Sequence, residues 1–299
     1  MGEYYLRILS AGADPNIDIV AVHGLNPKSK KNHAEKTWES NGKLWLRDFL
    51  PKQLPRARIF LFSYNSKVAI QSSAAGVREQ AHVLLDRLRL ERENCEYRPL
   101  LFIAHSLGGI VVKEALVQAK LSATYGSICT STFGIAFFGT PHRGTHLARV
   151  GGVAAKIVRA ILGTASNTLL KALSKGSLYA LELSANFDKL LENYKYLSFY
   201  ETLPFKSIGI VVEKESAVLG LPDSREKAVA LNADHEEICR FHCDEDDNYH
   251  AANRTVMVPF TRNPGFVGRE HTLSQVMERI MPLGKAHSRV ALYGLGGVG

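Results

Sequence analysis

The chain contains only four cysteines in 299 residues. This number is too small for a disulfide scaffold, and we expect reduced thiols in an intracellular protein. Long apolar runs are also lacking. The longest stretch without a charged residue, Leu121–His142, is interrupted by serine, threonine and glycine, so it predicts a buried strand and its approach loop rather than a membrane span. Because the N-terminus lacks a basic start before an apolar run, and Leu6 stands where myristoylation needs serine or threonine, we expect a cytoplasmic location.

No continuous basic stripe with interleaved aromatic residues is present, so we do not expect a nucleic-acid partner. The chain is nevertheless basic, with 37 Lys and Arg against 29 Asp and Glu, a net charge of +8. This excess favours an acidic partner such as an anionic substrate or a phospholipid surface. Residues 145–175 hold five basic residues and no acidic one, which would suit contact with an anionic membrane; a water-facing surface is the simpler interpretation.

Five short apolar runs predict buried strands. They are Ile17–Val22, Arg58–Phe62, Leu100–Ala104, Gly134–Phe138 and Ser207–Val212. Between them, helical spacing of apolar residues predicts helices over Gly76–Leu90 and Leu107–Lys120. The alternation indicates an α/β fold with a mostly parallel central sheet that helices cover on both faces.

The composition divides the chain into three parts. Residues 1–243 carry the predicted strands and helices, with a helical insertion at about 145–196 that we expect to act as a cap. Residues 244–262 are polar and acidic, which predicts a linker. Residues 263–299 open a second, incomplete unit.

The most informative motif is Ala104-His105-Ser106-Leu107-Gly108, between a predicted strand and a predicted helix. A serine on such a sharp turn needs small residues two positions before and after it, here Ala104 and Gly108, because larger side chains would collide. The turn would present Ser106 as a nucleophile, with the Leu107 N–H at the helix N-terminus facing a developing oxyanion. His105 is expected to face away from the site. An ordinary N-cap serine is the alternative interpretation.

A second oxyanion donor should come from the loop after an earlier strand. The predicted strand Ile17–Val22 runs directly into His23-Gly24-Leu25. The small Gly24 would let the Leu25 N–H approach the serine. His23 precedes the serine and belongs to this loop, so it is not the expected base.

The acid and the base should follow the serine in the order Asp or Glu, then His. His235 is the predicted base that takes the proton from Ser106. Glu213 and Glu215 follow the predicted strand Ser207–Val212, and only one of them is expected to reach His235. Zinc binding is an alternative, because histidine and cysteine recur at helical spacing in this segment, although the spacing matches no common zinc finger. The residues concerned are His235, Cys239, His242 and Cys243.

Six blocks of sequence resemble, in this order, the serine esterase branch of the α/β hydrolases. They read DIVAVHGLNP, TWESNGKLWLRDFLPKQLPRARIFLFSYNS, LLFIAHSLGGIVVKEAL, GIAFFGTPHRGT, VVEKESAVLG and LNADHEEICRF. That branch includes the serine active site-containing proteins, which are relatives of the inositol-deacylase lipases, and the N-terminal domains of many fungal NOD-like receptors. The resemblance implies an α/β-hydrolase fold without cofactor or metal. It implies Ser106 as nucleophile, Leu25 and Leu107 as oxyanion donors, His235 as base, and Glu215 or else Glu213 as acid.

The C-terminal residues carry a second resemblance. GFVGRE, a helix over Thr272–Met281, a strand over Val290–Tyr293 and GLGGVG resemble the opening of a STAND-type (NB-ARC-like) nucleotide-binding domain. A P-loop needs Gly-x-x-x-x-Gly-Lys-Ser/Thr. Gly294 to Gly299 match its first six positions and the lysine is absent, so we expect no useful nucleotide binding.

Together the two resemblances imply the front part of a longer fungal receptor. We expect hydrolysis of an ester or lipid acyl bond as the output of that receptor in programmed cell death. The alternative is a catalytically silent interaction module in immunity or heterokaryon incompatibility, because fold does not dictate function. The two hypotheses differ in whether the nucleophile, the base and the acid are all present, and in this sequence each of these roles has a candidate residue.

Overall fold

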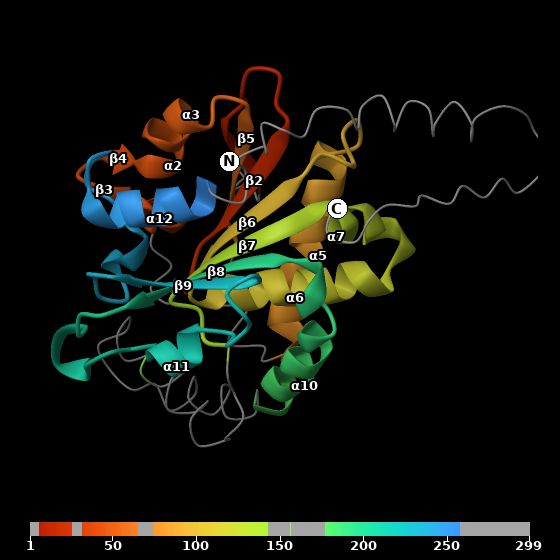
Figure 1. The fold of residues 1–299 in the computed structure, drawn as a ribbon. Helices are drawn as coiled ribbons and strands as arrows, with labels where there is room; N and C mark the ends of the chain where they lie inside the picture. Colours follow the sequence, from red (N-terminus) through yellow and green to blue (C-terminus); the bar gives the residue numbers. More distant parts are fainter. Residues whose placement is uncertain (1–5, 26–31, 65–73, 143–155, 157–176, 258–299) are drawn as a thin grey trace, which may run out of the picture. The chain divides into compact units, whose positions relative to one another are not determined.

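The computed structural model describes residues 6–25, 32–64, 74–142, 156 and 177–257. In this part, seven strands form one sheet in the order β1-β5-β2-β6-β7-β8-β9 (Figure 1). They are Leu6–Ser10, Ile17–Val22, Ala57–Phe62, Leu100–His105, Thr132–Phe138, Lys195–Glu201 and Glu226–Leu231, labelled β1, β2, β5, β6, β7, β8 and β9. β1 pairs antiparallel with β5, and all other neighbours are parallel. The predicted mostly parallel sheet is therefore confirmed.

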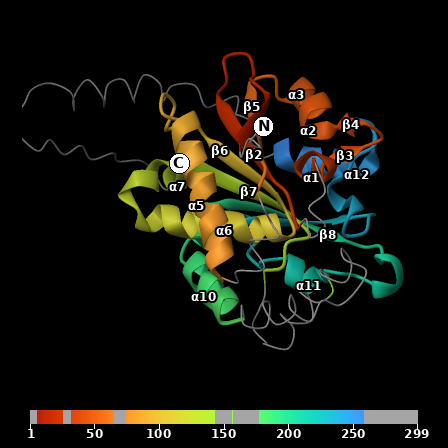
Figure 2. The same ribbon diagram turned by 180° about the vertical axis from the view of Figure 1, so that it is seen from behind.

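One face of the sheet is covered by α5 (Ala74–Glu91), α6 (Leu107–Leu121), α7 (Gly126–Ser131) and α10 (Ser177–Asp188) (Figures 1 and 2). The two predicted helices correspond to α5 and α6. Their buried side chains, such as Leu84, Leu88 and Leu116, pack against sheet residues such as Phe102 and Phe137. This apolar layer is continuous, which agrees with the uninterrupted apolar runs of the central strands.

Short elements and one C-terminal helix lie on the other side of the central strands. They are α1 (His33–Lys36), the hairpin β3 (Glu39–Ser40) and β4 (Lys43–Leu44), α2 (Trp45–Asp48), α3 (Leu50–Gln53) and α12 (Asp247–Met257). Tyr249 of α12 packs against Trp45 and Phe49, with ring centroids 6.0 and 5.7 Å apart. The predicted linker 244–262 is therefore wrong over α12, which belongs up to Val256 to the compact unit Met1–Val256.

The predicted strand Ser207–Val212 is also wrong. The 3-10 turn η3 (Lys206–Ile208) occupies its start, and Gly209 has a φ of 78°, which breaks an extended backbone. Val211 and Val212 are buried instead in a small apolar cluster with Phe205 and Ala217. The remaining short elements are η1 (Ala123–Tyr125), η2 (Leu191–Asn193), α11 (Lys214–Ala217) and η4 (Glu237–Cys239).

Most of the predicted cap 145–196 lies outside the described residues. Its last part forms α10, where Leu183 and Phe187 pack into the core beside α6, and the strand β8 begins at Lys195. That end of the segment covers the sheet rather than the site. The unit 263–299, with Gly294 and Gly299, lies outside the described residues altogether. Within the described part, no helix combines the length and apolar character that crossing a membrane requires.

The strand order places a switch point between β2 and β6. From β2 the chain moves outward to β5, and it returns to the other side of β2 to form β6, β7, β8 and β9 in succession. In open α/β sheets, ligands bind beyond the carboxyl ends of the strands at such a point. The two loops that leave β2 and β6 there carry Leu25 and Ser106.

Candidate active site

Ser106 occupies a strained turn between β6 and α6. Its φ of 51° and ψ of −119° lie in a region that residues other than glycine rarely adopt. Three hydrogen bonds hold the turn. The Ser106 N–H donates to the Phe138 carbonyl at 2.9 Å, and the Ser106 carbonyl accepts from the Gly109 N–H at 3.1 Å and from Thr140 Oγ1 at 3.2 Å. The surroundings thus fix a conformation that an isolated serine would avoid.

Small residues allow α6 to begin directly against the end of β2. A Cβ atom on Gly108 would lie 2.4 Å from the Val22 carbonyl oxygen and 2.5 Å from that of His23. Ala104, two residues before the serine, is fully buried in β6. Leu107 is the first residue of α6, and the first N–H groups of a helix have no partner within it. The turn therefore places the first backbone N–H groups of α6 beside the end of β2.

The loop after β2 lies against the same turn. A Cβ atom on Gly24 would come within 3.2 Å of Ser106 Cβ. His23 Nδ1 lies 2.7 Å from the Gly24 carbonyl and Nε2 lies 3.2 Å from the Tyr64 N–H, so Nδ1 carries the hydrogen and Nε2 accepts. Because the Leu25 N–H belongs to the same peptide as the Gly24 carbonyl and points the opposite way, His23 fixes its direction. Burial lowers the pKa of His23 to about 3, which keeps the ring neutral.

The structure places Ser106 and His235 within hydrogen-bond distance. Ser106 Oγ lies 3.0 Å from His235 Nε2, and the two side chains are 0% and 2% exposed. The His235 loop follows β9 and is shaped by Asp234, whose carboxylate accepts from the N–H groups of Glu236 and Glu237. The backbone of Gly139, with a φ of 54°, lies beside the ring, since a Cβ atom there would be 3.1 Å from Nδ1.

Glu201, the last residue of β8, stands at the other nitrogen of this ring. Its Oε1 is 3.6 Å from His235 Nδ1, and its side chain is fully buried. Glu201 also accepts a short hydrogen bond from the Val212 N–H. In the described part of the chain, Glu201 Oε2 and His235 Nδ1 are both buried without a hydrogen-bond partner. A shift of a few tenths of an ångström would join carboxylate and imidazole, and such bonds often tighten when a ligand binds.

Neither predicted acid occupies this position, so the prediction of Glu215 or Glu213 is corrected. Glu213 is 62% exposed and pairs with Lys156 at 3.0 Å. Glu215 is exposed on α11. The cause is the misplaced strand: the sheet position assigned to Ser207–Val212 belongs to β8. The sequence analysis does not predict Glu201, because Lys195–Glu201 mixes polar and aromatic residues, adjoins a predicted helix and so does not read as a buried strand. The usable signal in the sequence is an acidic residue directly after an extended aromatic run.

His105 is also placed differently from the prediction. Instead of facing away, its Nε2 lies 2.9 Å from the His235 carbonyl oxygen, and the two rings are 5.2 Å apart. The zinc alternative fails on contacts in the described residues. Cys239 Sγ donates to the Thr37 carbonyl, and His242 Nδ1 lies 2.6 Å from Ser40 Oγ, so the side chains do not converge.

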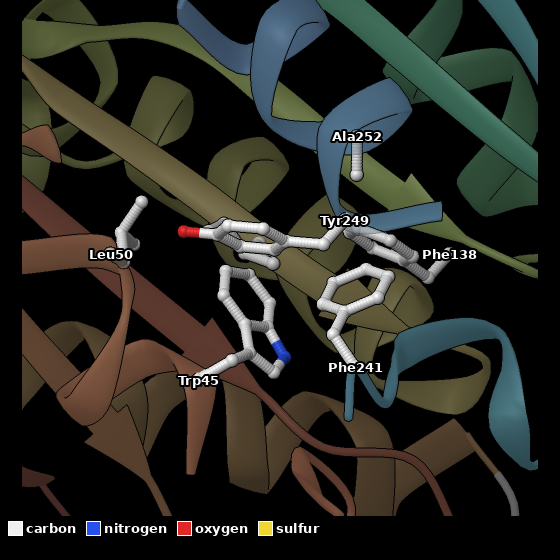
Figure 3. A pocket seen from close by; sticks show the side chains of 7 residues that line it. Trp45, Leu50, Phe138, Phe241, Tyr249 and Ala252 are labelled. Carbon is white, nitrogen blue, oxygen red and sulfur yellow. The ribbon is translucent and has the colours of Figure 1, made fainter. Parts of the chain in front are cut away.

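A small apolar pocket of about 10 Å³ lies where α12 packs over the strand ends (Figure 3). Its lining is aromatic and aliphatic: Trp45, Leu50, Ile103, Phe138, Phe241, Tyr249 and Ala252. Figure 3 shows the Tyr249 hydroxyl on the side of Leu50. Phe138 connects this pocket to the elbow, because its carbonyl accepts the Ser106 N–H. The pocket thus backs the serine turn and includes neither Ser106 nor His235 in its lining.

Comparisons with known proteins agree with this architecture. No family model matches the chain. Among solved structures, it resembles the Bacillus licheniformis lipase BlEst2 in mature form, with a TM-score of 0.52 and 17% identity over 86% of this chain and 97% of that chain. A Staphylococcus aureus protein of unknown function gives a TM-score of 0.50 at 13% identity, over 85% of this chain and 92% of that one. The chain has the α/β-hydrolase fold.

In sequence, the chain is 28% identical over 247 residues to the protein SERAC1 of Danio rerio. SERAC1 of Homo sapiens gives the same identity over the same length. In both cases the match covers 75% of this chain and 36% of the relative. The chain thus spans about a third of the length of these curated relatives.

Proposed function

We propose that the chain is a serine hydrolase that cleaves an ester or lipid acyl bond. The observation that carries this proposal is the 3.0 Å contact between Ser106 Oγ and His235 Nε2 on a strained turn at the switch point of the sheet. A structural serine has no need of this backbone conformation, whereas the conformation places a nucleophile at the carboxyl end of the sheet beside its base. The fold is similar to that of a lipase, but because fold does not dictate function, the proposal depends on the geometry at Ser106.

The residues would act in two half-reactions. His235 Nε2 takes the hydroxyl proton as Ser106 Oγ attacks the acyl carbonyl, and the Leu25 and Leu107 N–H groups stabilise the oxyanion. The imidazolium then gives its proton to the departing alkoxide, which leaves an acyl-serine and a free alcohol. Water, deprotonated by His235, attacks this ester, and the acid departs as the proton returns to Ser106. Glu201 would accept from Nδ1–H and stabilise the imidazolium.

Two finer proposals concern the whole protein. The role of this domain as the N-terminal effector of a NOD-like receptor is proposed from the resemblance of the hydrolase part to such domains and from the sequence of residues 263–299. Contact with an anionic membrane is likewise proposed from the basic residues of 145–175. Neither is needed for the chemistry at Ser106.

A fluorophosphonate probe tests the hydrolase proposal, because it reacts covalently with activated serines. We expect labelling of the wild type, none of Ser106→Ala, and labelling of His235→Ala that is slower by roughly 10³-fold or more. The matched control is Ser40→Ala. Ser40 also contacts a histidine, His242, at 2.6 Å, but it lies on the β3–β4 hairpin and not at a helix N-terminus, so its loss should leave labelling unchanged.

A small probe, diisopropyl fluorophosphate, should be run alongside a long-chain one, because Ser106 is fully buried. A folded wild type that reacts with neither would refute the proposal. Equal labelling of the wild type and Ser106→Ala would place the reactive serine elsewhere.

A further inference from the structure

His235 and Ser106 follow strands that are not neighbours in the sheet. The base follows β9 at the edge of the sheet, whereas Ser106 follows β6, and the strands β7 and β8 lie between them. In the described part of the chain, two hydrogen bonds join the two loops directly. One is the contact of His235 Nε2 with Ser106 itself, and the other is that of His105 Nε2 with the His235 carbonyl at 2.9 Å.

The second bond defines the state of the His105 ring. A carbonyl oxygen only accepts, so Nε2 carries the hydrogen and Nδ1 is left as a bare acceptor. The residue is 8% exposed. Burial lowers the pKa of His105 well below its ordinary value, and the neighbouring His235 lowers it further. The ring therefore stays neutral and adds no positive charge beside the imidazolium that the proposed reaction forms at His235.

His105 also contacts the loop of the proposed oxyanion donor. A Cβ atom on Gly24 would lie 2.9 Å from His105 Nδ1, so the imidazole lies directly against this backbone. Trp38 backs the ring edge-on, with centroids 6.5 Å apart. One side chain thus lies between the base loop and the oxyanion loop and is itself part of the elbow.

We propose that His105 is a positioning residue that ties the His235 loop to the elbow and keeps the base at hydrogen-bond distance from Ser106. This inference rests on the proposed hydrolase function. Without the bond to its carbonyl, His235 would keep its side-chain contacts with Ser106 and Glu201, but its backbone would lose its hydrogen bond to the elbow. A displacement of about 1 Å at a catalytic group costs up to roughly 100-fold in rate.

Three substitutions separate the hydrogen bond from mere bulk. The amide nitrogen of His105→Gln reaches the position of Nε2, that of His105→Asn reaches only the position of Nδ1, and His105→Leu has no donor. With p-nitrophenyl acetate as substrate, we expect His105→Asn and His105→Leu to lower kcat by about 10- to 100-fold, with KM within about twofold of wild type. His105→Gln should keep kcat within about threefold of wild type.

Hydrogen exchange gives a readout that does not depend on activity. In folded variants, the backbone amides of residues 232–240 should exchange faster in His105→Asn and His105→Leu than in wild type. In His105→Gln they should exchange at the wild-type rate. An inert wild type would refute the hydrolase proposal, and the exchange pattern would still decide the role of His105. If His105→Leu and His105→Gln had the same kcat and the same amide exchange rates, the positioning role would be overturned, whatever the activity of the wild type.

Discussion

At the scale of single residues, Lys113 is a buried lysine that we expect to lower the free energy of unfolding when it is charged. It lies on α6 and is only 4% exposed, with its ammonium 5.2 Å from the ring centroid of Phe187 and 5.7 Å from that of Phe137. Burial lowers its pKa from 10.5 to about 7, although the carboxylates of Asp188 and Glu226 act in the opposite direction. The aromatic faces stabilise the cation only in part.

The pH dependence of this effect follows from linkage. The folded pKa of Lys113 lies below the unfolded one, so between pH 7 and 10.5 the unfolded chain binds more protons and stability rises with pH. We predict that Lys113→Met raises the free energy of unfolding below pH 7 by roughly 2 to 4 kcal/mol. The gain should shrink between pH 7 and 10.5. Urea unfolding at several pH values measures it.

The control for this prediction is Lys120→Met in the last turn of the same helix. Lys120 is exposed, so its substitution should change stability by less than about 0.5 kcal/mol at every pH. If the gain from Lys113→Met did not vary with pH, it would come from packing and not from charge.

At the scale of elements, the junction of β6 and α6 depends on close backbone contact. In Gly108→Ala, the new Cβ would meet two carbonyl oxygens at 2.4 and 2.5 Å, and backbone at the end of a central strand has little freedom to move. We predict a loss of about 3 kcal/mol in stability together with loss of probe labelling. Thermal unfolding and labelling of the same samples test both effects.

Gly126→Ala is the matched control. Gly126 begins α7 with a helical φ of −55°, and a Cβ atom there would meet nothing within 4 Å. This change should be neutral or stabilising by less than about 1 kcal/mol. An equal loss of stability in both variants would show that the contact at Gly108 is not what matters.

How far the sequence predicts this fold depends on the element. β2, β5, β6 and β7 are buried in the sheet and read as apolar runs, so their positions were predicted to within about two residues. β9 is an edge strand whose four middle residues are exposed or half-buried, and β8 interleaves lysine and serine with aromatics, so neither strand reads as a continuous apolar run. The apolar run that was predicted instead packs in a cluster that only the tertiary structure reveals.

At the scale of the whole molecule, the candidate site forms where loops from four parallel strands meet. β2 leads to Gly24 and Leu25, β6 to Ser106, β8 ends at Glu201, and β9 leads to His235. Ser106 and His235 are 129 residues apart in sequence. The serine and the histidine could be proposed from local motifs and from their order along the chain. The acid is harder to assign, because its identity depends on which segment forms the strand beside β9.

We propose that Ser106, His235 and Glu201 act together, and the rate of fluorophosphonate labelling reports on all three residues. For Glu201→Gln, in a folded protein, we predict a rate at least roughly 100-fold below wild type, because the amide cannot stabilise the imidazolium. Glu215→Gln and Glu213→Gln, both exposed, should stay within about twofold of wild type. The account would be contradicted if Glu201→Gln labelled at the wild-type rate while Glu215→Gln or Glu213→Gln lost labelling.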